Sequence, residues 1–309
     1  MTDTDSQELR RVLGALALNR EPGWHFAGHF FDVSFDEMGA GDVSLSILPD
    51  AHCELGDGQA HMAAVSILAD LAMSAAMRWH ADFAMRMATV TMSLQFTGAP
   101  RRGLLQARGY FDGFIQAPSG LRDQGLCRAE IRAGDDLVCT ATGSFLAMRR
   151  HTGMASMQLR KRADSEPVQA LLPEALTDAE RAVYERALKA LEPGPGSFIE
   201  RFWGLQPQRL DDGAVCRLEN GPQVGNRVGH TQGGITVALA ALTANAALGE
   251  KWQLAGISSW YVRPGTGPAL LARATVTHRG THTAVVDVDV TNENGDTVLR
   301  ALTNHISRG

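Results

Sequence analysis

The chain has 309 residues, a length that predicts about two domains. Its apolar fraction of 44% indicates globular domains with real cores, and its formal net charge of −5, with no basic block, argues against a nucleic-acid partner. The four cysteines lie far apart without a C-x-x-C pair, which excludes a disulfide framework or a zinc ribbon and indicates a reduced, cytoplasmic protein with no bound metal.

The first half of the chain predicts a helix, two strands, a long apolar helix and then four strands. Its polar, acidic N-terminus is not a signal peptide. Apolar residues recur at helical spacing over 7–19 and alternate in the manner of strands in the later segments. The predicted elements are the helix 7–19, the strands 24–33 and 43–48, the helix 61–79, and the strands 88–96, 104–111, 126–131 and 137–147.

The second half repeats this order, so we interpret the chain as an internal duplication. Thr177 with Glu180 forms a capping box that starts a helix over 177–191. A first domain at 1–150 is thus joined to a second at 177–309 by a polar, basic linker at 151–176. The other elements of the second half are the strands 198–205 and 214–218, an apolar helix from about 232, and the strands 256–262, 269–277, 284–290 and 297–306.

The two long helices are apolar on every side and must therefore be enclosed. They contain polar residues and break at Arg78 and Glu250, so they read as core helices of a soluble fold and not as membrane spans. Successive strands without crossover helices predict an α+β fold, in which an antiparallel sheet wraps around each helix. Two such units can pair sheet to sheet, with their helices on opposite faces or flanking a shared seam.

Asp70 is the only ionisable residue between Met62 and Met77. A buried charge is costly without a partner, so this residue belongs to an active site or to a structural pair. His61 is nine residues away, which is ~13.5 Å along a helix and about half a turn out of phase. Asp70 therefore needs partners from elsewhere in the fold, and a helix N-terminus is a suitable place to hold a developing oxyanion.

Two short motifs carry a resemblance to a known family. His61-Met-Ala followed by Asp70, and Gln232-Gly-Gly234 at the start of the second apolar helix, resemble the two halves of one pattern. That pattern is the H-G-G motif, with Asp nine residues on, of hotdog-fold acyl-CoA thioesterases of the phenylacetate-degradation (PaaI-like) type. The resemblance covers nearly the whole chain and implies a tandem double hotdog.

The resemblance also implies a composite site between the two hotdog units. One unit supplies the carboxylate and an assisting hydroxyl, and the other supplies a backbone N–H at its helix start and an asparagine. These roles fall on Asp70 as the catalytic carboxylate, Thr89 as its hydroxyl partner, Gly233 as the oxyanion donor and Asn226 as the asparagine.

The departures from the family pattern are complementary. Gln232 replaces the motif histidine of the second half, and Met62-Ala63 replaces the glycine pair of the first. Ala241 occupies the aspartate position of the second half, and Leu55 the asparagine position of the first. Each half has thus kept one part of a single site, which predicts one working site per chain.

The implied reaction is hydrolysis of an acyl-CoA thioester, with no cofactor beyond the coenzyme A of the substrate. Asp70 would deprotonate water or attack the carbonyl itself. Glycines at 233 and 234 would let the carbonyl approach the backbone closely. The residues expected near the substrate are Gln232, Gly234, His61 and His230.

Several alternatives stay open at this point. His61 could instead be a structural residue at a helix start, His230 a displaced functional histidine, and Gln232 a helix cap. The chain could be a non-catalytic acyl-CoA-binding or regulatory protein, or a hotdog hydratase, although the motif of the latter is missing. The acyl group is not readable from the sequence, and two chains could associate as a homodimer.

Overall fold

The two halves of the chain contain the same elements in the same order. The computed structural model describes residues 6–39, 43–81, 85–116, 123–149, 155 and 159–308. The first half contains α1 (Gln7–Asn19), α2 (Phe26–Phe30), β1 (Ser34–Met38), β2 (Val43–Ile47), α3 (Met62–Ala81), β3 (Arg86–Phe96), β4 (Leu105–Phe114), β5 (Gln124–Ala133) and β6 (Asp136–Met148). The second contains α4 (Asp178–Leu191), α5 (Phe198–Trp203), β7 (Gln208–Arg209), β8 (Gly213–Glu219), α6 (Gly233–Leu248), β9 (Trp252–Tyr261), β10 (Ala269–Arg279), β11 (Thr283–Asn292) and β12 (Thr297–Ser307).

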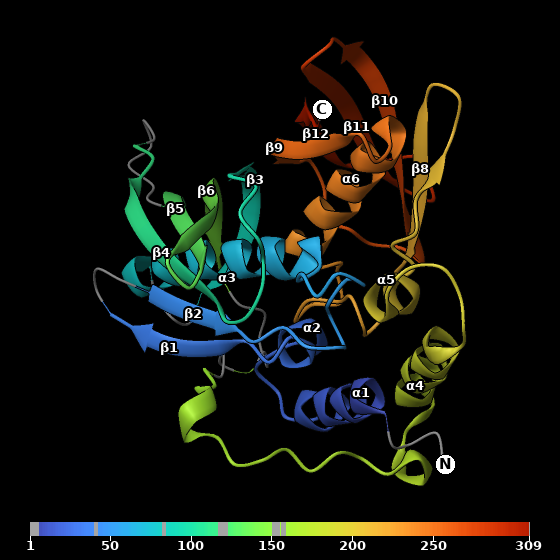
Figure 1. The fold of residues 1–309 in the computed structure, drawn as a ribbon. Coiled ribbons are helices and arrows are strands. Elements are labelled where there is room, and N and C mark those ends of the chain that lie inside the picture. Colours follow the sequence, from blue (N-terminus) through green and yellow to red (C-terminus); the bar gives the residue numbers. More distant parts are fainter. Residues whose placement is uncertain are drawn as a thin grey trace.

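One antiparallel sheet of twelve strands joins the halves, in the order β1-β2-β4-β5-β6-β3-β9-β12-β11-β10-β8-β7 (Figure 1). The order reads the same from both edges once corresponding strands are equated. β3 and β9 form the central pair, in which Ser93 faces Ser258 and donates a hydrogen bond to it at 3.2 Å. The α+β class and the antiparallel sheet predicted from the sequence are therefore confirmed.

The apolar helices α3 and α6 lie against the sheet, and their N-terminal ends meet at its centre (Figure 1). In α3, 16 of 20 residues are buried, because apolar side chains cover all of its faces. By length and composition α3 could cross a membrane, but 89% of its apolar window is buried inside the fold. At the crossing the Ser66 hydroxyl donates to the carbonyl of Gly234 at 2.8 Å. The two helices therefore flank one seam.

Two predicted strands are helices instead. Segments 24–33 and 198–205 form α2 and α5, so these predictions were wrong. Aromatic residues, which favour strands in a sequence, are here spaced four apart and stack on one helix face: Phe26 on Phe30, and Phe198 on Phe202. The first strands of the halves are instead Ser34–Met38 and the two-residue β7, which sequence reasoning missed.

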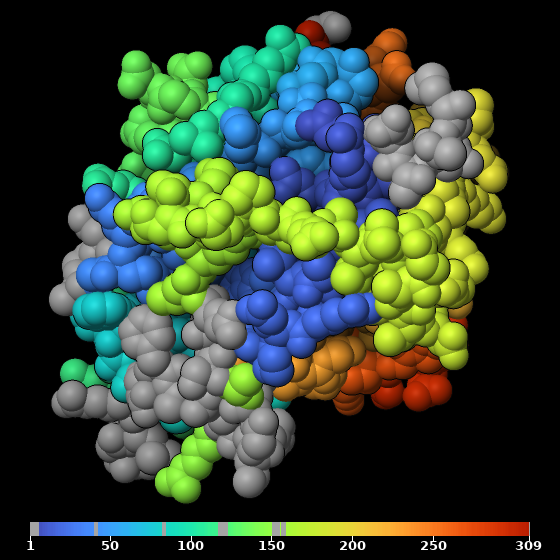
Figure 2. Space-filling view, turned by 90° about the horizontal axis from the view of Figure 1, so that it is seen from below, coloured from blue at the N-terminus to red at the C-terminus, as the bar shows by residue number. Residues whose placement is uncertain are grey.

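Residues 159–171, which we call the strap, follow the first half and cross its surface. Figure 2 shows this segment running over the N-terminal residues. The strap carries a short 3-10 turn, η2 (Arg162–Asp164), and pairs with the chain beneath it, since the Phe35 N–H donates to the carbonyl of Arg160 at 2.8 Å. A second turn, η3 (Pro173–Ala175), precedes α4. The proposed domain limits, with a linker at 151–176, stay a prediction.

The helix crossing gives a first testable prediction. A Cβ on Gly234 would lie 2.6 Å from the Cα of Ile67 and 2.7 Å from its nitrogen, both backbone atoms of α3. Gly234→Ala should therefore lower the free energy of unfolding by ~1–3 kcal/mol through overpacking. Gly56→Ala is the matched control, because a Cβ there meets nothing within 4 Å. Urea unfolding checks both variants, and equal stability of the two would refute close packing at this crossing.

Candidate active site

Asp70 receives its partners from both halves of the chain. The Thr89 hydroxyl donates to its Oδ1 at 2.8 Å, and the Gln232 side-chain amide donates to its Oδ2 at 2.7 Å. Asp70 itself is only 6% exposed. The lone acid of α3 is thus paired by neutral donors, one from the next strand and one from 162 residues further along the chain.

The local structure around each donor fixes its direction. β3 carries a bulge, with Val90 as the extra residue between Thr89 and Thr91. Bulges re-aim neighbouring side chains, and here the neighbour is the hydroxyl that faces Asp70. Gln232 is the N-cap of α6, and its Oε1 accepts the Ile235 N–H at 3.0 Å. Because this oxygen is engaged by the helix, the Nε2 donor is the end directed at Asp70.

The N-terminus of α6 lies directly at the carboxylate. A Cβ on Gly233 would be 3.3 Å from Oδ2 of Asp70, 3.4 Å from its Oδ1, and 3.1 Å from the Thr89 hydroxyl. The Gly233 N–H has no acceptor within the described part of the chain. An unpaired N–H at the positive end of a helix is suited to hold an oxyanion. Gly233, the predicted oxyanion donor, is therefore adjacent to Asp70, the predicted catalytic carboxylate.

Gly234 lies at the contact between the two apolar helices. Its lack of a side chain lets α6 contact the backbone of α3 at Ile67. Its N–H also faces Asp70 and stabilises the charged carboxylate. The close approach of a substrate carbonyl to Gly233 and Gly234 stays a prediction.

Burial raises the pKa of Asp70 to about 6, even though the hydrogen bonds from Thr89, Gln232 and the Gly234 N–H act in the opposite direction. A carboxylate with a pKa in this range is still ionised at neutral pH but accepts a proton readily. Such a group suits general acid–base chemistry near pH 7.

The two predicted histidines take no part in the hydrogen bonds of the carboxylate. His61 is fully buried at the start of α3, where its Nδ1 accepts the Ala63 N–H at 3.2 Å. Burial lowers the pKa of His61 to about 3, so the ring is neutral. His230 is half-buried, and burial together with the positive charge of Arg86 lowers its pKa. Neither histidine makes a hydrogen bond to Asp70.

Asn226 organises the loop that leads into α6. Its Oδ1 accepts the N–H groups of Val228 at 3.0 Å and His230 at 3.1 Å. Its side-chain N–H donors stay without a partner in the described chain. A cavity of about 560 Å³ opens beside this loop, and Asp70 is not part of its wall. The residues in contact with this cavity include Trp24, His25, Phe26, Asn226 and Arg227.

The corresponding position in the other half has no acid. β9 carries the matching bulge at Ala255, which makes Leu254 the counterpart of Thr89. Ala241 stands where α3 has Asp70, and both replacements are buried. Within the described residues, no group of three or more His, Cys, Asp or Glu side chains could hold a metal ion.

Tyr261, the last residue of β9, is a further residue of the site. Its hydroxyl donates to the carbonyl of Gly233 at 2.7 Å. Burial and the nearby Asp70 carboxylate raise the pKa of Tyr261 well above its usual range, so it remains a donor. A comparison of the two halves could have indicated this residue. Phe96 ends β3 as Tyr261 ends β9, but Phe96 has no hydroxyl group.

Comparison with known proteins identifies the fold. Residues 233–299 match the model of the thioesterase superfamily, and no curated protein matches the chain in sequence. A candidate oleoyl thioesterase from Lactobacillus plantarum superposes with a TM-score of 0.55 at 12% identity, over 87% of this chain and 97% of that one. The chain therefore has a hotdog fold, and its residues 233–299 resemble the thioesterase superfamily.

Two further solved structures cover the chain to a similar extent. The 12:0-ACP thioesterase from Umbellularia californica superposes with a TM-score of 0.52 at 12% identity, over 86% of this chain and 94% of that one. A protein of unknown function with a hot dog fold, from Alicyclobacillus acidocaldarius, gives 0.52 at 11% identity, over 90% and 96%. In this hotdog protein, the Asp70 site lies where the N-terminal ends of α3 and α6 meet.

The raised pKa of Asp70 predicts a pH-dependent stability. Because the pKa is about 6 in the folded protein against an ordinary 3.8, the folded state binds this proton more tightly. Stability from this group is therefore present below pH 3.8 and lost as the pH rises through about 6. The Asp70→Asn variant stays neutral at every pH. Its free energy of unfolding, relative to that of the wild type, should therefore increase by ~1–3 kcal/mol from pH 4 to pH 8.

Urea unfolding of both proteins at the two pH values measures this gain. Asp136→Asn, at an exposed aspartate at the start of β6, is the matched control and should show no such change. A stability difference for Asp70→Asn that is the same at both pH values would contradict the raised pKa.

Proposed function

We propose that the chain is an acyl-CoA thioesterase of the PaaI-like type, built as a tandem double hotdog with one composite site. The observation that carries the proposal is the contact between Asp70 of the first half and Gln232 and Gly233 at the N-terminus of α6. An acid poised near neutral pH beside an unpaired helix N–H is the pair of groups that acyl transfer to water requires.

In the proposed reaction, the thioester carbonyl accepts a hydrogen bond from the Gly233 N–H. Asp70 takes a proton from a water molecule while the oxygen of that water attacks the carbonyl carbon. The resulting oxyanion is stabilised by the Gly233 N–H and the dipole of α6. As the carbon–sulfur bond breaks, Asp70 returns the proton to the thiolate, which leaves a carboxylic acid and a free thiol.

The neighbouring residues position this pair. Thr89 and Gln232 hold the two oxygens of Asp70, and Tyr261 holds the Gly233 peptide through its carbonyl. Asn226 lines the loop cavity of about 560 Å³, and we assign this cavity to the part of the substrate away from the thioester. His61 is assigned a structural role at the start of α3, and His230 a place beside the loop.

We further propose that the protein is cytoplasmic and needs no metal or cofactor apart from the coenzyme A of its substrate. It includes a second, inactive position at Ala241, since that position lacks an acid. The most direct test is release of free thiol from a panel of acyl-CoA compounds. Binding of acyl-CoA without thiol release would favour the alternative, a non-catalytic acyl-CoA-binding protein.

Asp70→Asn tests the carboxylate. We expect kcat for thiol release to fall by ~10²–10⁴, the usual contribution of a positioned general base. In the wild type, kcat/KM should rise with pH through the pKa of about 6 and level off above it. Asp136→Asn is again the control and should keep full activity. Full activity in Asp70→Asn would remove this residue from the mechanism.

Gln232→Glu tests the contact between the halves. The variant loses the donor to Asp70 and places a second acid beside it, so the two carboxyl groups compete for a proton. The rising limb of the pH–rate profile should therefore move to higher pH by about one unit or more. An unchanged profile, measured with the same acyl-CoA, would show that Gln232 does not control the charge of Asp70.

A further inference from the structure

The hydroxyl of Tyr261 is an additional donor to a carbonyl that α6 already uses. Its acceptor is the carbonyl of Gly233, the first residue of α6, at 2.7 Å. In a regular helix this oxygen accepts the N–H group four residues further on, and a carbonyl oxygen has a second lone pair for another donor. The backbone of α6 is therefore satisfied at this carbonyl without Tyr261.

The same peptide unit faces Asp70 with its other side. The carbonyl of Gly233 and the N–H of Gly234 belong to one planar amide. This N–H lies in the first turn of α6, where a helix offers it no acceptor. It donates to the carboxylate of Asp70 and stabilises the charged form. Tyr261, the amide and Asp70 therefore form a chain of contacts that runs from β9 through the start of α6 to α3.

Tyr261 stays a donor over the pH range in which Asp70 changes its charge. Burial and the nearby Asp70 carboxylate raise the pKa of Tyr261 well above its usual range, so the hydroxyl keeps its proton. The other side chains that donate to Asp70, Thr89 from β3 and Gln232 from α6, are neutral. A donor at the carbonyl oxygen polarises the amide and makes its N–H a stronger donor, by ~10–30% per bond.

The corresponding position in the other half lacks this arrangement. Phe96 ends β3 as Tyr261 ends β9, and it has no hydroxyl to offer. In the described part of the chain, the side-chain contact to the carbonyl of Met62, the first residue of α3, comes from Ser66 of the same helix. That position has Ala241 in place of an acid. The hydroxyl from the sheet is thus present at the helix start that faces an acid and missing at the other.

We propose that Tyr261 is a positioning residue of the Asp70 site, and that it acts on the carboxylate through the Gly233–Gly234 peptide. Its hydroxyl fixes the orientation of this peptide and strengthens the Gly234 N–H as a donor to Asp70. The charged carboxylate, which is the form that accepts a proton, is thereby favoured. A role of this contact in catalysis rests on the proposed thioesterase function, whereas its effect on the charge of Asp70 does not.

Tyr261→Phe tests the proposal, because it removes only the hydroxyl. The amide signal of Gly234 in an NMR pH titration reports the charge of the carboxylate that it faces. In the wild type the midpoint should lie near the Asp70 pKa of about 6. In Tyr261→Phe it should move up by ~0.1–0.6 of a pH unit, since this corresponds to 10–30% of a charge-assisted hydrogen bond. The Gly234 amide proton should also move upfield.

Tyr184→Phe, on α4, is the matched control. It makes the same chemical change, and the Tyr184 hydroxyl has no hydrogen bond within the described residues. The Gly234 midpoint should therefore stay at its wild-type value. An equal shift in this variant would overturn the proposal.

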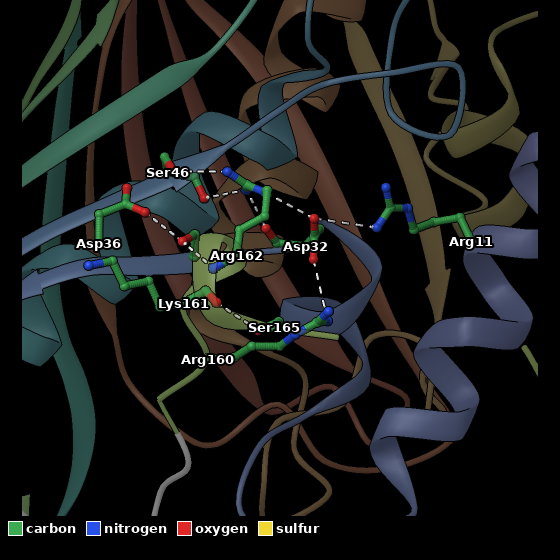
Figure 3. Close-up of polar contacts among 9 residues, drawn as sticks. Arg11, Asp32, Asp36, Ser46, Arg160, Lys161, Arg162 and Ser165 are labelled. Carbon is green, nitrogen blue, oxygen red and sulfur yellow. Dashed lines mark hydrogen bonds and ion pairs between the residues drawn. The ribbon is translucent and has the colours of Figure 1, made fainter. Parts of the chain in front are cut away.

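Asp32→Asn is the control for a general loss of stability. Arg11 from α1, and Arg160 and Arg162 from the strap, form ion pairs with Asp32 (Figure 3). The variant weakens these contacts, and asparagine tolerates the left-handed backbone of this position, where φ is 50°. Because none of these residues contacts the Asp70 site in the described structure, the Gly234 midpoint should not move.

An unchanged or lower midpoint in Tyr261→Phe would overturn the proposal, and so would an equal shift in Asp32→Asn. The hydroxyl would then be a buried polar group that binds the nearest acceptor, as most buried tyrosine hydroxyls do.

Thiol release from acyl-CoA separates this inference from the proposed function. In a thioesterase, the rising limb of the Tyr261→Phe pH–rate profile should move by the same amount as the Gly234 midpoint. A chain that releases no thiol but shows the NMR shift keeps the link between Tyr261 and Asp70 and loses the thioesterase assignment. Thiol release with an unmoved profile would overturn the role of Tyr261 in the reaction.

Discussion

The amide of Gln232 is the contact on which the organisation of this protein depends. One end caps α6 through the Ile235 N–H, and the other donates to Asp70 in α3. A single side chain thus fixes where the second helix begins and satisfies the buried acid of the first. Both require that the N-terminal ends of the two helices meet, which the absence of a side chain at Gly234 makes possible.

The neutral donors around Asp70 also explain why its pKa lies close to neutral pH. A lysine or arginine in the place of Gln232 would pair the carboxylate strongly and lower its pKa. The hydroxyl and amide donors stabilise the ionised carboxylate, but less than burial destabilises it. The pKa of Asp70 therefore stays at about 6. The same burial that suits proton transfer subtracts from stability above the pKa, as expected where function and stability conflict.

Sequence reasoning succeeded where the periodicity of the chain was strong. The repeated order of elements, the two apolar helices and the isolated acid follow from patterning alone, and the family resemblance placed Gly233 beside Asp70. The strand predictions for 24–33 and 198–205 were wrong because aromatic residues are enriched in strands. The spacing of four between these aromatic residues, and the Ser197–Glu200 capping box, indicate helices instead. Tyr261 and the double role of Gln232 depend on how distant elements meet, which no local pattern encodes.

The two halves share one order of elements and one sheet, but they differ in the residues at corresponding positions. Paired identical units would carry two copies of every site residue, so each change would affect both sites. Two halves in one chain are free of this restriction: the Ala241 and Leu254 positions can be filled for packing while Asp70 and Thr89 are kept. Apolar residues at the second position avoid the cost of a second buried acid, since an unpaired buried carboxylate would destabilise the core at neutral pH. The asymmetry of the site is therefore a consequence of its burial.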